Sequence, residues 1–127
     1  MKKIRLTTFR IFQAMAVIGA FLLMGGLIEG HAILKESSPA ANSKVAGPNV
    51  PIMLKFNVRI DAKLSKVQLL HPDNSTSDLA LEAQTSADTL NSKAAGLIPG
   101  AYQIRWQVLA PDGHITRGIV PFTVSGS

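Results

Sequence analysis

Two parts of the sequence carry side chains that could bind one metal ion together. His31 follows a long apolar segment, and Asp112-Gly113-His114 lies near the C-terminus. If the chain is cut after Gly30, His31 becomes residue one and offers two nitrogens, its α-amine and its imidazole, which close a chelate ring. An unperturbed α-amine has a pKa of about 7.7–8.0, so a metal can displace its proton at neutral pH. In the alternative, the cut falls elsewhere and His31 is an ordinary solvated residue.

In Asp112-Gly113-His114 a carboxylate and an imidazole are two residues apart, and the glycine allows a backbone that turns both to one side. Asp-Gly is also a common turn dipeptide, so Asp112 could simply cap a turn while His114 is a surface residue. Together with His31, these residues supply three nitrogens and one carboxylate oxygen. Tetragonal nitrogen and oxygen ligation suits Cu(II), whereas Zn(II) could take the same atoms tetrahedrally. The higher intrinsic affinity of Cu(II) favours copper.

The remaining candidate groups give little support for a second site. His71 lies in the turn sequence His71-Pro72-Asp73 without a second ligand beside it, and we expect it to have no role in metal binding. The absence of cysteine excludes a thiolate site and disulfides. Of the four methionines only Met53 follows residue 30, which excludes a methionine cluster for Cu(I). No nucleophile with a neighbouring base is recognisable, so the residues give no sign of catalysis.

The first thirty residues have the pattern of an export signal. Basic residues up to Arg10 are followed by the uncharged, mostly apolar stretch 11–28 and by Gly30, a small residue at the expected cut. Residues 1–30 are therefore predicted to be a signal peptide. An uncleaved membrane anchor is the alternative, since about 17 residues is the lower limit for a spanning helix, but Gly25-Gly26 weakens such a helix. In either case residues 31–127 are expected outside the cytoplasmic membrane, in the periplasm or secreted.

The net charge of +5 is largely a property of this first segment. Four of the 13 basic residues and one of the 8 acidic residues precede His31, so the remainder is close to neutral. Its basic residues are also scattered along the sequence, which argues against nucleic-acid binding. Contact with a membrane is expected only through an uncleaved first segment.

Strands must position the candidate ligands, because the sequence between them alternates with period two. The clearest alternations lie at residues 50–56 and 102–108, and shorter or weaker strands are expected at 32–35, 67–70, 79–81, 89–93 and 119–124. Residues 42–48 have loop composition, with Gly47-Pro48 as a break. Six or seven short strands without a long helical period indicate an all-β domain over residues 31–127, an antiparallel sandwich or barrel.

These features resemble those of the CopC-like copper-resistance family, in its Cu(II)-only form. The resemblance is carried by His31-Ala32, Ser38-Pro39-Ala40, Pro48, the strand at 50–56, Gly100-Ala101-Tyr102, Trp106, Asp112-Gly113-His114, Gly118 and Phe122-Thr123-Val124. It covers essentially the whole of residues 31–127, with a poor match in the middle of the domain. It implies an immunoglobulin-like, cupredoxin-related antiparallel β-sandwich with Greek-key connections.

The resemblance also implies a site and a function. The family binds Cu(II) through the N-terminal amine and imidazole, an Asp and a final His, which correspond here to His31, Asp112 and His114, with one ion per chain. The implied role is an exported Cu(II)-binding protein for copper buffering, resistance or delivery to a CopD-like membrane copper transporter. The alternatives are a copper-dependent monooxygenase with an N-terminal histidine brace and a metal-free immunoglobulin-like interaction module. We expect no enzyme, because Asp112 would fill the coordination place that oxygen needs.

One departure from the family concerns the end of the strand at 50–56. The family often has Phe-Ser-Glu there, and its acid lies near the copper. This chain has Phe56-Asn57-Val58, so that acid is absent and Asn57 could replace it only in part. Because such outer partners orient the ligands, we expect a shifted copper affinity.

Overall fold

The computed structural model describes residues 31–126, and the expected signal peptide or anchor at residues 1–30 lies outside this range. The described part contains eight strands and one short 3₁₀ turn: β1 (Leu34–Ser38), β2 (Ser43–Ala46), β3 (Val50–Phe56), η1 (Ala62–Leu64), β4 (Lys66–Leu70), β5 (Thr76–Leu79), β6 (Thr89–Ala94), β7 (Gly100–Leu109) and β8 (Ile115–Ser125). Within residues 31–126 there is no helix with the length and apolar character needed to cross a membrane.

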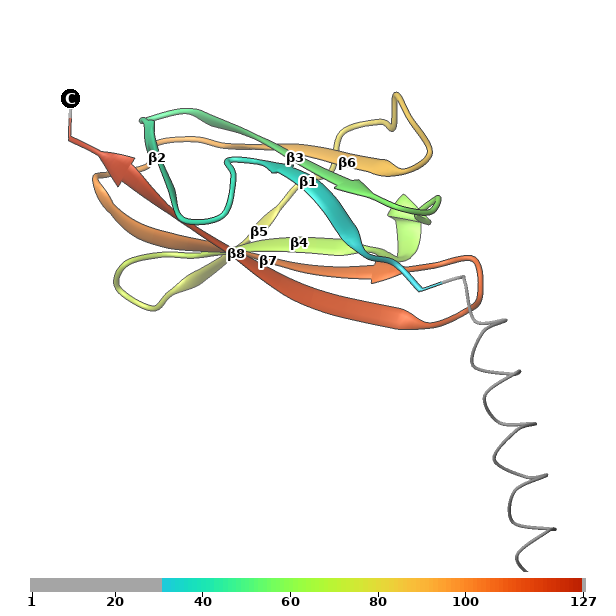
Figure 1. The fold of residues 1–127 in the computed structure, drawn as a ribbon. Helices are drawn as coiled ribbons and strands as arrows, with labels where there is room; N and C mark the ends of the chain where they lie inside the picture. Colours follow the sequence, from blue (N-terminus) through green and yellow to red (C-terminus); the bar gives the residue numbers. More distant parts are fainter. Residues whose placement is uncertain (1–30, 127) are drawn as a thin grey trace, which may run out of the picture.

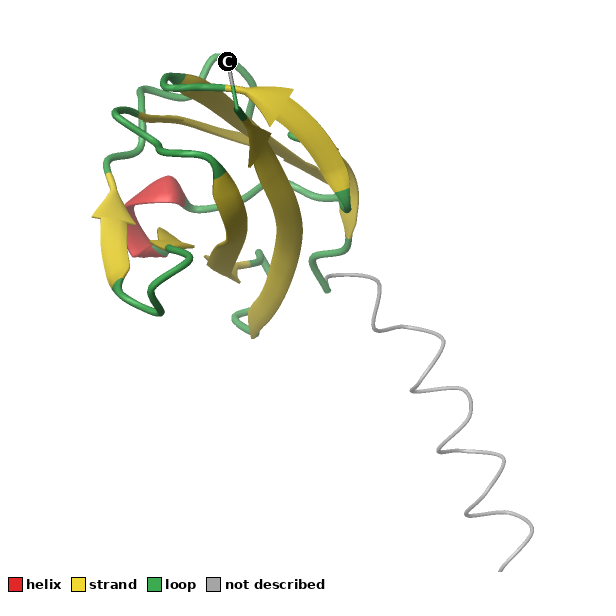
Figure 2. Ribbon diagram, turned by 90° about the vertical axis from the view of Figure 1, so that its left-hand side faces the viewer, coloured by secondary structure: helices red, strands yellow, loops and turns green. Residues whose placement is uncertain are grey.

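The strands form two sheets that pack face to face (Figures 1 and 2). The smaller sheet has the order β1-β3-β6 and the larger sheet the order β2-β8-β7-β4-β5. Every pairing is antiparallel except that of β2 with β8, which is parallel. The prediction of an all-β antiparallel sandwich is confirmed, with one parallel pair added.

The alternation read from the sequence fills the space between the sheets. The alternate residues of β3, β7 and the second half of β8 are buried, and the fully buried side chains among them include Leu54, Phe56, Ile104, Val108 and Phe122. Tyr102 and Trp106 belong to the same core, at 2% and 7% exposure. Because successive side chains of a strand point to opposite faces, the intervening residues are left on the two outer surfaces.

Two local predictions were wrong. Residues 42–48 were expected to be a loop, but Ser43–Ala46 form β2, which pairs with Phe122–Ser125. The weak strand expected at 79–81 lies earlier, at Thr76–Leu79. The chain crosses to the smaller sheet just after it, since the carbonyl of Ala80 accepts a hydrogen bond from the Ser92 hydroxyl of β6 at 2.6 Å.

This topology brings the two candidate ligand segments to the same end of the sandwich. The segment that leads into β1 and the turn between β7 and β8 lie beside each other there (Figure 1). The β4–β5 turn, which contains His71, lies at the opposite end, as the pairing of Leu70 with Gln103 requires. His71 is therefore far from the other two histidines.

Candidate metal centre

The β7–β8 turn holds Asp112 and His114 in a fixed arrangement. The amide of Ala110 donates to the carbonyl of His114 at 3.1 Å, and the amide of Gly113 donates to the carbonyl of Ala110 at 3.0 Å. Gly113 has a φ of 83°, a left-handed conformation that glycine adopts without steric cost. The glycine thus makes the tight turn that places both side chains on one side.

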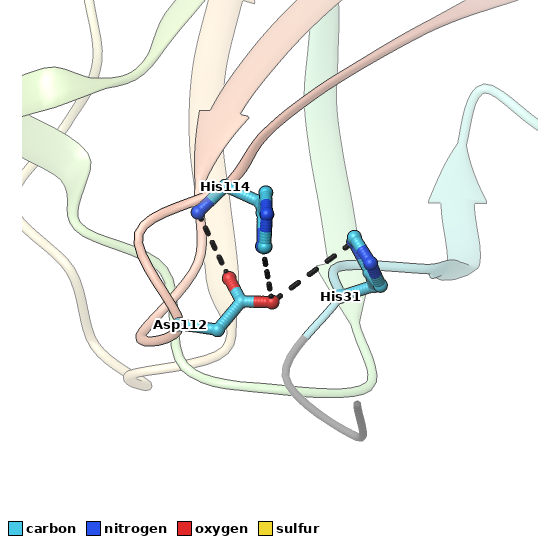
Figure 3. Close-up of side chains that lie close together, drawn as sticks. All are labelled: His31, Asp112 and His114. Atoms are coloured by element: carbon cyan, nitrogen blue, oxygen red, sulfur yellow. Dashed lines mark hydrogen bonds and ion pairs between the residues drawn. The ribbon is translucent and has the colours of Figure 1, made fainter. Parts of the chain in front are cut away.

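Asp112 both caps this turn and faces the histidines (Figure 3). Its Oδ1 accepts a hydrogen bond from the backbone N–H of His114 at 2.9 Å, and its Oδ2 lies 2.9 Å from Nδ1 of the same residue. These two contacts, the backbone bond first, hold the pKa of Asp112 below its ordinary value of 3.8. The carboxylate is therefore charged at neutral pH, and its side chain is only 20% exposed.

His31 reaches the same carboxylate from the other sheet. Its Nδ1 lies 4.0 Å from Oδ2 of Asp112, and its ring centroid lies 4.8 Å from that of His114, with the planes tilted by 32°. The next residue, Ala32, is buried in the core at 3% exposure, which fixes the chain directly after His31. The three predicted ligand residues are thus brought together, although they lie far apart in the sequence.

The three side chains suit a Cu(II) ion in type, and their spacing is slightly wider than one ion requires. One ligand atom from each lies within 4.8 Å of the others. Two atoms bound to one ion at about 2.0–2.2 Å can be at most about 4.4 Å apart. The His31 and His114 side chains are 50% and 61% exposed, so small rotations can close the set. The donors are nitrogen and carboxylate oxygen, as Cu(II) prefers.

Asn57 has a role in this region that the sequence did not reveal. Its Oδ1 accepts a hydrogen bond from the amide of Ile33 at 2.7 Å, and its own amide donates to the carbonyl of Ile33 at 3.0 Å. The prediction considered Asn57 only as a partial substitute for an acid near the metal. Its contacts are instead with the backbone of Ile33, two residues after His31. The sequence does not show which distant residues will pair in this way.

His71 lies apart from the metal centre, as expected. Its Nε2 is 2.9 Å from the hydroxyl of Ser77, and its ring packs edge-on against Tyr102 with centroids 5.5 Å apart. Both contacts join the turn to the body of the larger sheet. They give this histidine a structural role at the end of the sandwich away from Asp112.

Comparisons with known proteins agree with this fold. The family model for the CopC domain matches residues 34–125. The chain is 31% identical to protein YobA of Escherichia coli strain K12 over 97 residues, which are 74% of this chain and 78% of that protein. It is 30% identical to copper resistance protein C of Escherichia coli, over 87% of this chain and 99% of that protein.

A solved structure gives the same result. The crystal structure of CopC from Methylosinus trichosporium OB3b matches with a TM-score of 0.69 and 28% sequence identity, over 75% of this chain and 94% of that chain. The family consists of copper resistance proteins and not of enzymes, which removes the monooxygenase alternative. With one domain spanning residues 34–125 matched in sequence and in fold, the chain belongs to the CopC family.

Proposed function

We propose that this protein is exported and binds one Cu(II) ion through the α-amine and imidazole of His31, the carboxylate of Asp112 and the imidazole of His114. Its relationship to copper resistance proteins supports a function in copper resistance. The observation that carries the site is the cluster itself, with three ligand-type side chains from two sheets meeting within 4.8 Å at one end of the sandwich.

The proposal includes removal of residues 1–30 as a signal peptide. Only a cut after Gly30 gives His31 the free amine that completes a four-atom ligand set. The mature domain then works outside the cytoplasmic membrane, in the periplasm or an equivalent compartment. The first test is the N-terminal sequence of the exported protein. A start before His31 would remove the amine from the ligand set, and a start after it would remove both atoms of His31.

Within that compartment, we assign the protein to copper buffering or to delivery of the ion to a CopD-like membrane transporter. The site is at a surface-exposed end of the domain, and both histidine side chains are at least half exposed. A partner can therefore reach the ion without unfolding the domain. A cargo site differs from a catalytic one in this respect, since the ion must be able to leave.

The contribution of the amine can be tested with one added residue before His31. This variant keeps both imidazoles and the carboxylate but loses the chelate ring to the terminal amine. Its Cu(II) affinity should fall by orders of magnitude relative to the exported protein, while the melting temperature of the metal-free protein stays the same. Equal Cu(II) affinity would show that the amine is no ligand.

Selectivity for oxidation state gives an independent test. The mature domain should take up one Cu(II) and little Cu(I), because it has no cysteine and only Met53 after residue 30. Titration with Cu(I) against a competing chelator measures this. Tight uptake of Cu(I) would contradict the proposed ligand set.

A further inference from the structure

The strand that begins at the metal centre has an uncovered edge. On one side β8 pairs with β7 along its whole length, but on the other side β2 pairs only with Phe122–Ser125. Figure 1 shows the short β2 beside the C-terminal end of β8, away from the metal centre. Among the described residues, no strand pairs with the other edge of β8 between Ile115 and Ile119.

The backbone groups on this edge can be identified. The carbonyl of Pro121 accepts a hydrogen bond from the amide of Asn42, on the β2 side. Because peptide groups alternate in direction along a strand, those of Ile115, Arg117 and Ile119 point to the same side. Pro121 fits this assignment, since proline has no N–H and is tolerated in a strand only where that group faces an edge.

The other edges of the two sheets are protected in ways that β8 is not. Strand β1 has a bulge between Leu34 and Glu36, and β2 and β5 have only four residues each. The edge of β6 is covered in part, since the amide of Glu82 donates to the carbonyl of Asn91. Natural sheets blunt their edges with such devices. Among the described strands, the edge of β8 from Ile115 to Ile119 is neither bulged, nor short, nor covered by another segment.

Large apolar side chains lie along this open edge. Ile115 and Ile119 are 52% and 55% exposed, and Arg117 lies between them on the same outer face. A strand added beside β8 would place its own side chains next to these three. It would therefore need apolar residues at both ends and an acidic residue between them, in the pattern apolar-x-acidic-x-apolar.

The outer face beside this edge is basic. Arg105 pairs across the sheet with Ile119, and Lys66 and Arg117 flank Gln107 on either side. These basic residues line a hollow of about 310 Å³ on the outer surface. The carboxylate of Asp78 lies on the same face, where it accepts a hydrogen bond from the side-chain amide of Gln68 at 2.7 Å. A segment with negative charge is thus complementary to this face.

We propose that the edge of β8 from Ile115 to Ile119 binds an extended, acidic segment of a protein partner as an added strand. The inference rests on the proposed function in that the partner is taken to exchange copper with this protein. Ile115 directly follows His114, so a strand docked on this edge has one end beside the ion. Main-chain hydrogen bonds would supply the affinity, and the charge of Arg117 and its neighbours would select the partner.

A second copy of this chain fits the edge poorly. Two β8 edges that met in antiparallel fashion around their centres would place Arg117 opposite Arg117 of the other copy, and like charges directly opposite each other destabilise a strand pair. Arg117 therefore acts against self-association and in favour of an acidic partner.

The test uses a capped peptide, Thr-Val-Thr-Glu-Thr-Val-Thr, titrated into the metal-free exported protein and followed by NMR. The expected result is a shift of the resonances of Ile115 to Ile119 and slower amide exchange at Arg117 and Ile119. In the free protein these two amides should exchange faster than those of Thr116, Gly118 and Val120, which face β7. The same peptide with Lys in place of Glu should bind at least about tenfold more weakly.

A charge exchange makes the test specific. Arg117→Glu should weaken binding of the Glu peptide by about tenfold or more and allow the Lys peptide to bind. The matched control is Lys35→Glu on β1, which should leave both affinities unchanged. Arg117 is exposed, so its variant should fold and keep the Cu(II) affinity and electron spin resonance spectrum of the wild type.

Several results would overturn the proposal. These are the absence of shifts at millimolar peptide, binding at another face, or equal binding of the Lys peptide. Dimers of the free protein in sedimentation would identify a second copy as the occupant. Binding to phosphatidylglycerol vesicles through Arg117 without peptide binding would identify a membrane surface. The peptide is titrated into metal-free protein, so its result does not depend on Cu(II) binding. The proposed copper site is tested separately in the exported protein, and the two proposals can therefore fail independently.

Discussion

Asn57 and Ile33 are joined by two hydrogen bonds across the gap between the end of β3 and the segment before β1. The side-chain Oδ1 of Asn57 accepts from the amide of Ile33 at 2.7 Å, and the amide of Asn57 donates to the carbonyl of Ile33 at 3.0 Å. His31 lies two residues earlier in the chain. The pair thus limits the positions that the first imidazole can take.

Replacement of Asn57 by Ala should lower Cu(II) affinity by about tenfold, because groups that orient ligands contribute about 10–100-fold. The electron spin resonance spectrum should broaden as His31 becomes less well placed. Asn57→Asp keeps an acceptor for the Ile33 amide and should restore most of the affinity. Asn91→Ala on β6 serves as the control. A loss confined to thermal stability, with the copper spectrum unchanged, would show that Asn57 does not position the ligand.

Asp112 and Asp73 allow ligation to be separated from turn capping. Each accepts a hydrogen bond from the amide two residues later, at 2.9 Å in both cases. Asp112→Ala should weaken Cu(II) binding by more than about a hundredfold, the upper range for loss of a merely supporting group. It should also raise the reduction potential, because an anionic oxygen favours the oxidised ion. Asp73→Ala should leave copper binding unchanged. Equal Cu(II) affinity and reduction potential in the two variants would show that Asp112 only caps the turn.

His114→Ala should weaken Cu(II) binding at least as much as Asp112→Ala, since an imidazole is a strong copper ligand. The metal-free protein should still fold, because the His114 side chain is 61% exposed. His71→Ala is the matched control at the opposite end of the domain. It should lower the melting temperature slightly, through lost contacts with Ser77 and Tyr102, and leave the copper spectrum intact. A copper deficit in His71→Ala would reveal a second binding site.

Between about pH 8 and about pH 5, titration of Asp112 should not contribute to the pH dependence of copper binding. His114 lowers the pKa of this carboxyl, chiefly through its backbone N–H. Because this pKa lies below 3.8, Asp112 stays charged over the whole range from about pH 8 to about pH 5. From about pH 8 to about pH 5 the advantage of wild type over Asp112→Asn should therefore stay constant. Convergence of the two affinities within this range would contradict the prediction.

Gly118 should be essential for packing rather than for binding. A Cβ at this position would overlap the indole of Trp106, whose ring lies against the backbone of β8. Gly118→Ala should lower the free energy of unfolding by about 1–3 kcal/mol, the usual cost of overpacking. Gly126→Ala has open space around it and is the control. Equal melting temperatures would mean that Trp106 moves aside at no cost.

The sequence predicted the parts of the fold that have a strong alternation. Val50–Phe56 and Gly100–Leu109 are buried on every second residue, and such a period can be read without knowing the partners. Ser43–Ala46 could not be recognised, since its only larger apolar residue is Val45 and its existence depends on pairing with Phe122–Ser125. Short strands are determined by their neighbours rather than by their own residues.

The same distinction applies to the metal centre. Asp112, Gly113 and His114 form a local motif, and the left-handed Gly113 confirms why a glycine separates the two candidate ligands. The structure places His31 beside them, as predicted. Its role as a ligand stays a prediction. The contacts of Asn57 with Ile33 could not be foreseen, because they join residues that only the completed fold brings together.

The position of His31 at the start of the folded domain has a mechanical consequence. Nearly the whole domain lies between His31 and Asp112 in the covalent chain. A copper ion bound to both would convert this length into a closed ring, and a denatured ring has far fewer conformations than an open chain. The loaded protein would thus resist unravelling from its first residue under force or in denaturant, and removal of the ion by a chelator would reopen the ring in one step.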